Sequence, residues 1–119
     1  MKRWSPPGRT RHAQGMAYFG VRGGDVVVEV AVFRGLVDLM LDHPGLDDGA
    51  VRLLNEEREV GALSFDLVPP ALREQLESAL AWACDAAAAG KRSSRSGDEV
   101  AEPERLMHGA DAVRAHLTE

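Results

Sequence analysis

Residues 16–33, MAYFGVRGGDVVVEVAVF, determine the fold class that the sequence predicts. Two apolar runs meet at Gly23-Gly24, and such a pair supplies the positive φ angles of a two-residue hairpin turn. A turn at this place makes Tyr18 face Glu29 and separates apolar from polar side chains by alternation. The stretch therefore predicts an antiparallel hairpin, and its apolar face consists of Ala17, Phe19, Val21, Val26, Val28, Val30 and Val32.

The chain after the hairpin changes to helical spacing. Residues 34–43 carry leucine, valine and methionine at helical intervals, and a Pro-Gly pair directly after them ends the run. Residues 46–60 are compatible with a helix capped by Asp47 or Asp48, and also with a strand from Val51 to Leu54 that turns at Asn55–Glu57 into the next strand. Of these two alternatives we favour the helix.

Two further segments complete the predicted core. Residues 60–68 alternate between apolar and polar side chains, which predicts a strand with one buried face. Residues 69–90 predict the longest helix, because a Pro-Pro pair suits its first turn and Gly90 suits its C-terminal cap. The inner face of the predicted strand consists of Leu63, Phe65 and Leu67.

The composition divides the chain into four parts. Residues 1–14 predict a flexible basic arm, 15–90 an α+β domain, 91–102 a flexible polar linker, and 103–119 a C-terminal helix. The predicted domain is a small antiparallel sheet, made of the hairpin and at least one further strand, packed by two or three helices. The C-terminal helix is tethered to it by the linker.

Length and composition narrow the class of protein. The chain has 119 residues and a net charge of −5, which is enough for one domain with a real core. A single cysteine excludes an internal disulfide and a zinc site built from cysteines. No apolar window is long enough for a membrane span, so we expect a cytoplasmic protein. The absence of isoleucine and the excess of arginine over lysine are typical of a high-GC bacterial genome.

No set of side chains converges on catalysis. Cys84 lies inside the longest predicted helix beside Asp85, which disfavours a reactive thiolate. The acidic turn from Asp42 to Asp48 is interpreted as a helix end followed by a capped helix start, not as a metal site. We therefore expect no catalytic residue, no metal and no cofactor.

Three polar residues could line a small-molecule site. Tyr18, Glu29 and Asp66 fall on the polar faces of predicted strands. They form a candidate ligand-binding or catalytic site if that side of the sheet is covered, and they face water if it is open. A small-molecule-binding protein or small enzyme is therefore the first alternative function.

The N-terminal arm gives a second alternative. Each of its basic side chains could neutralise one phosphate of a nucleic acid. The body of the chain opposes this function, because residues 25–90 carry a net charge of −9 and would repel the same phosphates. The basic residues of the arm are Lys2, Arg3, Arg9 and Arg11.

An excess of apolar surface predicts a protein partner. Trp82 lies on the flank of the longest predicted helix beside Ala86 and Ala89, where a large ring needs a covering surface. That surface is either the C-terminal helix of the same chain or a second protein, most simply another copy. The helix would contribute Leu106, Val113 and Leu117. The sequence thus favours a small acidic interaction or regulatory module, homodimeric and without catalytic activity.

Overall fold

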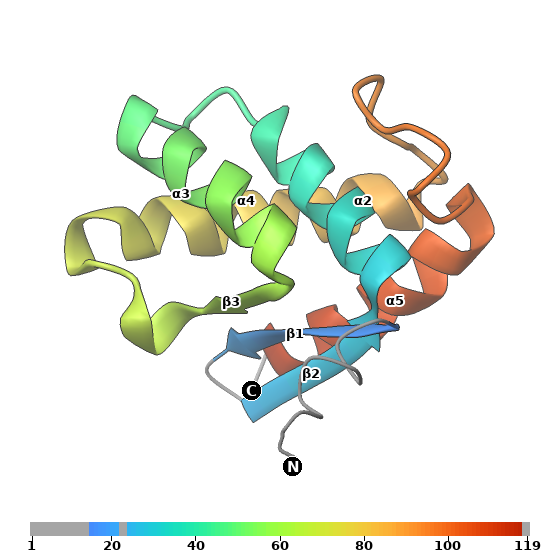
Figure 1. Ribbon diagram of the computed structural model, residues 1–119, viewed down its shortest axis with the longest axis horizontal. Coiled ribbons are helices and arrows are strands. Elements are labelled where there is room, and N and C mark those ends of the chain that lie inside the picture. The colour runs from blue at the N-terminus through green and yellow to red at the C-terminus, as the bar shows by residue number, and fades with distance from the viewer. Residues whose placement is uncertain (1–14, 22–23, 118–119) are drawn as a thin grey trace, which may run out of the picture.

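The predicted hairpin is present in the computed structural model, which describes residues 15–21 and 24–117 (Figure 1). Strand β1 (Met16–Val21) pairs antiparallel with strand β2 (Gly24–Glu29). The predicted register is wrong by two residues, since Tyr18 faces Val27 and not Glu29. Side chains alternate with a period of two, so this even slip leaves the inner face unchanged. The strand residues that are buried as predicted are Ala17, Phe19, Val21, Val26 and Val28.

The second strand ends earlier than the sequence predicts. Val30 and Val32 belong to helix α2 (Val30–Leu41), which follows Glu29 without a loop. Alternating valines are typical of a strand, but nine of the twelve residues of α2 are buried. A helix buried on almost every side has no polar face, so its pattern resembles that of a buried strand.

Residues 46–60 form a helix, as favoured. Helix α3 (Asp48–Val60) begins after Asp47, whose carboxylate accepts a hydrogen bond of 2.9 Å from the backbone N–H of Ala50. The helix ends at Gly61, which has a φ of 87°. Both ends therefore follow ordinary capping chemistry.

The third strand is shorter than predicted and runs in the other direction. Strand β3 (Ala62–Ser64) pairs parallel with β1, so the sheet has the order β2-β1-β3 and is mixed, not antiparallel throughout. The residues after it form the 3-10 turn η1 (Phe65–Leu67), and Leu67 is 85% exposed where an inward position was predicted. The chain reaches β3 from α3, which brings the Gly61 carbonyl beside the N–H of Tyr18.

The two remaining helices confirm the α+β class with a C-terminal helix. Helix α4 (Pro70–Ala88) and helix α5 (Pro103–Leu117) pack against each other and against α2. Figure 1 shows α2, α3 and α4 together on one side of the sheet. Gly90 follows α4 with a φ of 83°, as its predicted capping role requires.

Two glycines allow α5 to approach α2 closely. A Cβ atom on Gly35 of α2 would collide with the side chain of Leu106, and one on Gly109 of α5 would collide with Val32. Glycine in a helix costs about 1 kcal/mol relative to alanine. At these positions that cost is offset by the close packing that the missing side chains permit.

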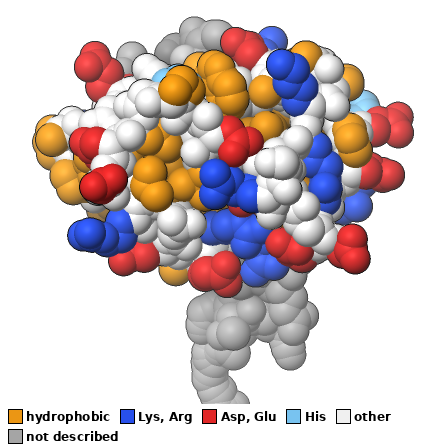
Figure 2. Space-filling model, turned by 90° about the horizontal axis from the view of Figure 1, so that it is seen from above, with side chains coloured by type: hydrophobic (Ala, Val, Ile, Leu, Met, Phe, Trp, Pro, Cys, Tyr) orange, Lys and Arg blue, Asp and Glu red, His pale blue; other side chains and the backbone are white. Residues whose placement is uncertain are grey.

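A buried ion pair joins α2, α3 and the segment 91–102. Asp38 is 2% exposed, and it accepts hydrogen bonds of 2.7 Å from Arg58 Nε and 2.7 Å from Ser96 Oγ. Arg58 also binds Glu99 at 2.8 Å, and its pKa is raised, first by the hydrogen bond to Asp38. Figure 2 looks down on this helical side and shows basic side chains lying among acidic ones.

The segment 91–102, predicted as a flexible linker, carries several defined contacts. Arg92 donates hydrogen bonds to the backbone carbonyls of Ser96, Val100 and Ala101. The N–H of Ala101 in turn donates to the carbonyl of Ala31 in α2. These contacts hold the segment beside α2, directly before the start of α5.

We expect Gly109→Ala to destabilise the protein although alanine is the better helix former. Overpacking against Val32 costs about 1–3 kcal/mol, which exceeds the gain in helix propensity of about 1 kcal/mol. In a Val32→Ala background the space is open, and the same substitution should stabilise the protein. Urea unfolding of the four proteins of this cycle measures both effects. An equal effect of Gly109→Ala in both backgrounds would contradict the close approach.

We expect Asp38→Ala to lower the free energy of unfolding by about 3–5 kcal/mol, because Arg58 loses its buried partner and keeps only the exposed carboxylates of Glu99 and Glu59. Glu59→Ala is the matched control. Glu59 also lies within 3.4 Å of Arg58 but is 71% exposed, so its removal should change stability by less than about 0.5 kcal/mol. Chemical denaturation measures the free energy of unfolding of both variants. Similar losses of stability in the two would contradict the prediction that the buried carboxylate contributes more than the exposed one.

Candidate functional site

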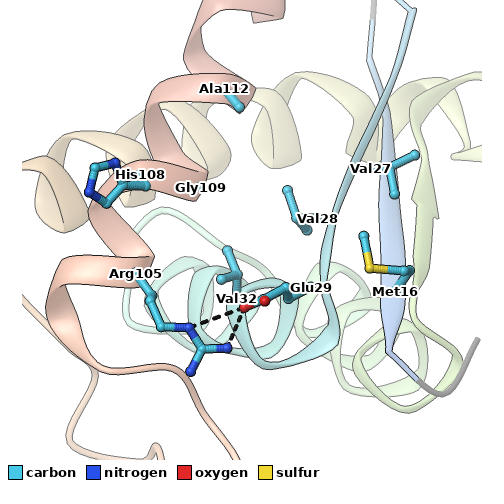
Figure 3. Close-up of a pocket in the computed structure, with 9 residues that line it drawn as sticks. All are labelled: Met16, Val27, Val28, Glu29, Val32, Arg105, His108, Gly109 and Ala112. Carbon is cyan, nitrogen blue, oxygen red and sulfur yellow. Dashed lines mark hydrogen bonds and ion pairs between the residues drawn. The ribbon is translucent and has the colours of Figure 1, made fainter.

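A groove of about 450 Å³ lies between β2 and α5 (Figure 3). Residues of β2 form one wall, and residues spaced along one face of α5 form the other. Gly109 and Ala112 lie on the α5 side, and their small size leaves space in the groove. The residues that line the groove are Met16, Val27, Val28, Glu29, Val32, Arg105, His108, Gly109 and Ala112.

The groove follows a free strand edge. The N–H of Val30 donates to the carbonyl of Gly15, so these two residues form a hydrogen-bonded pair of the antiparallel ladder. Pairing alternates along such a ladder, and Val27, opposite Tyr18, therefore points its N–H and C=O away from β1. β2 is an edge strand, and no hydrogen bond from elsewhere in the described chain reaches Val27.

An ion pair stands at one end of the groove. Arg105 Nε donates to Glu29 Oε1 at 3.1 Å, and Figure 3 shows the guanidinium and the carboxylate facing each other. The side chains are 48% and 53% exposed, so water screens the pair and it contributes little to stability. The hydrogen bond to Glu29 raises the pKa of Arg105 above its ordinary value. The end of the groove is thus polar, whereas its middle is apolar.

Exposed apolar side chains continue from the groove onto the outer face of the sheet. Val27 is 61% exposed and Met16 is 43% exposed, although both belong to strands. They also line a second hollow of about 270 Å³ together with Tyr18 and Val60. An exposed apolar edge strand is typical of a surface that pairs with another chain segment.

The structure does not bring the three predicted ligand-binding residues together. Tyr18 lies on the outer sheet face and lines the second hollow, whereas Glu29 lies in the groove and pairs with Arg105. Asp66 is exposed in η1, and no described contact connects it to either of the others.

The predicted interface residues are divided between surface and core. Trp82 is 38% exposed, and its ring forms a T-shaped pair with the ring of His43 at a centroid distance of 5.4 Å. Ala86 and Ala89 line a small hollow beside it, to which α5 contributes nothing. Leu106 and Val113 are fully buried against their own chain, and Leu117 is partly buried against the same core. Within this chain, α5 packs beside α2 and α4 and leaves the indole partly uncovered.

The groups considered for chemistry are otherwise engaged. Asp47 caps α3 and binds Gln75, and Asp42 pairs with Arg95. Cys84 is fully buried, and burial raises the pKa of its thiol to about 12. Among residues 15–21 and 24–117, no three His, Cys, Asp or Glu side chains gather as metal ligands.

Residues 1–14, including the basic residues Lys2, Arg3, Arg9 and Arg11, lie outside the described residues.

In the described part of the chain, every helix is too short or too polar to cross a bilayer. No protein-family model, no curated protein and no solved structure matches this sequence. The function is therefore inferred from the geometry of the groove and the charges around it.

The sequence contains a signal for the groove in its second strand. Val27 is an apolar residue at an outward position between Asp25 and Glu29, where alternation calls for a polar side chain. Arg105 and His108 had no such signal, because only tertiary packing places α5 beside β2.

We expect Cys84 to resist alkylation in the folded protein, because its thiol is fully buried and its pKa is near 12. Treatment with iodoacetamide at pH 8 should leave the native chain unmodified and should label one site after addition of denaturant. Mass spectrometry measures the label. Rapid labelling of the native protein would restore Cys84 as a candidate nucleophile.

Proposed function

We propose that this chain is a non-enzymatic protein-interaction module that binds an extended segment of a partner polypeptide along β2. The observation that carries the proposal is the free edge at Val27, whose N–H and C=O point away from β1 and which lines a groove with an apolar middle. In strand addition, main-chain hydrogen bonds supply affinity and alternate side-chain positions supply specificity. We further propose a cytoplasmic location, as the composition suggests.

The charges around the edge favour a cationic partner segment. Asp25 and Glu29 flank Val27 on the same strand face, and residues 25–90 carry a net charge of −9. An extended segment with basic side chains at alternate positions would set them opposite these two carboxylates. Electrostatic attraction would also accelerate its association and make binding sensitive to salt.

Pairing of β2 with β2 of a second copy is disfavoured. A two-fold axis through Val27 would place Asp25 of each copy opposite Glu29 of the other, and like charges directly opposite destabilise a strand pair. Self-association through another surface, such as the one around Trp82, stays a prediction.

The size of the groove suits a short segment. Its volume of about 450 Å³ lies in the range of small ligand pockets. Each main-chain hydrogen bond contributes about 0.5–1.5 kcal/mol net, so a few of them give weak, reversible binding. Weak binding of this kind is typical of regulatory contacts.

The test uses a peptide of alternating arginine and valine, titrated into the isotopically labelled full chain and followed by NMR. We expect chemical-shift changes at Val27 and Glu29 and at His108 and Ala112 across the groove. A glutamate–valine peptide is the matched control and should leave these signals unchanged, because it carries the opposite charge.

Two variants separate backbone pairing from simple charge attraction. Val27→Pro removes the outward N–H, and proline is tolerated at this kind of edge position. It should weaken binding by about tenfold, whereas Val27→Thr, which keeps the N–H, should bind within about twofold of the original chain. A peptide methylated at alternate amide nitrogens checks the same point without altering the protein. The proposal would be contradicted if Val27→Pro bound the peptide as well as Val27→Thr, or if the methylated peptide bound as well as the unmethylated one. Chemical-shift changes confined to another part of the surface would also contradict it.

A further inference from the structure

The start of the described chain lies at one end of the groove. The carbonyl of Gly15 accepts a hydrogen bond of 3.0 Å from the N–H of Val30, directly after the last residue of β2. Gly15 also lines a hollow together with Glu29 and Arg105, the ion pair that stands at that end. Any segment attached to Gly15 therefore begins beside the groove.

The segment attached there has the length that the groove requires. Fourteen residues precede Gly15, and an extended chain of that length reaches at most about 46–50 Å. Pairing with the six residues of β2 takes about 20 Å. The remainder is sufficient to carry the chain around the end of β2 to its free edge.

Its charge complements the surface. Residues 1–14 contain four basic side chains and no acidic one, whereas Asp25 and Glu29 lie along the free edge. The same segment contains Trp4. Its large apolar side chain is suited to cover the exposed apolar surface that includes Val27 and Met16. The N-terminal segment thus has the chemistry expected of the partner.

Tethering gives this segment an advantage over any free partner. A flexible attachment at the mouth of a site raises the effective concentration of the attached segment to the millimolar range. A segment with weak intrinsic affinity then occupies the site for much of the time, and a competing partner binds with correspondingly reduced apparent affinity.

From these observations we infer that the N-terminal segment, residues 1–14, is the resident occupant of the groove between β2 and α5 of its own chain. It pairs with the free edge of β2 through its backbone and sets its basic side chains against Asp25 and Glu29. The inference rests on the proposed function, since it assigns the first ligand of the same groove. The segment acts as a tethered competitor that an external cationic segment must displace.

The direct test is the exchange rate of the Val27 amide proton, measured by NMR on the full chain. A neutral-arm variant replaces Lys2, Arg3, Arg9 and Arg11 by glutamine. If the segment pairs with β2, the Val27 amide should exchange about tenfold or more slowly in the original chain than in this variant. Equal rates in the two proteins would overturn the inference.

A conservative variant is the control for charge. Arg3→Lys, Arg9→Lys and Arg11→Lys keep the positive charges of the segment, so protection of the Val27 amide should be retained. Protection should also be constant over about a hundredfold range of protein concentration, because a tethered segment binds within its own chain. Protection that grows with concentration would assign the segment to a second copy and overturn the inference as stated.

Peptide binding separates this inference from the proposed function. The arginine–valine peptide should bind the neutral-arm variant about tenfold more tightly than the original chain, and Val27→Pro in that variant should abolish the gain. If the peptide binds the groove of both proteins equally, the inference that residues 1–14 occupy the groove is wrong, whereas the proposed function as an interaction module is retained. If the peptide binds the groove of neither, the proposed function itself fails.

Discussion

The burial of helix α2 is the constraint on which the rest of the structure depends. Nine of its twelve residues are buried, and the sheet, α3, α4 and α5 all contact it. Phe33 packs against Phe19 of β1 with the two rings tilted and their centroids 4.8 Å apart, which connects the helix to the sheet. A helix surrounded on all sides must be apolar almost throughout, and its one buried acid, Asp38, is compensated by Arg58.

The position of α5 follows from this central helix. Gly35 and Gly109 permit close approach of the two helices, and Leu106 fills the space that Gly35 leaves. Helix α5 therefore contacts α2 and α4 as well as β2, and the edge of β2 beside it stays open as a groove. The same packing that completes the core thus creates the surface that we assign to function.

Charge is distributed unevenly along the chain. The body is acidic, and the part of the chain before β1 is basic. At the groove, Arg105 neutralises Glu29 only in part, since both side chains are about half exposed and screened by water. A cationic segment can therefore share Glu29 or compete for it, which would make occupancy reversible and sensitive to ionic strength.

The sequence by itself determined what depends on neighbouring residues. Alternation defined the inner face of the hairpin, Asp47 marked a helix start through local capping, and the long helix 69–90 followed from the prolines at its start and Gly90 at its end. Only the tertiary structure decided the register of the hairpin, because a slip of two residues preserves both faces. It also decided the change from strand to helix at Val30 and the pairing of Arg105 with Glu29, 76 positions apart. The reason is physical: local patterns depend on periodicity, whereas registers and distant contacts depend on which surfaces the packed helices leave free.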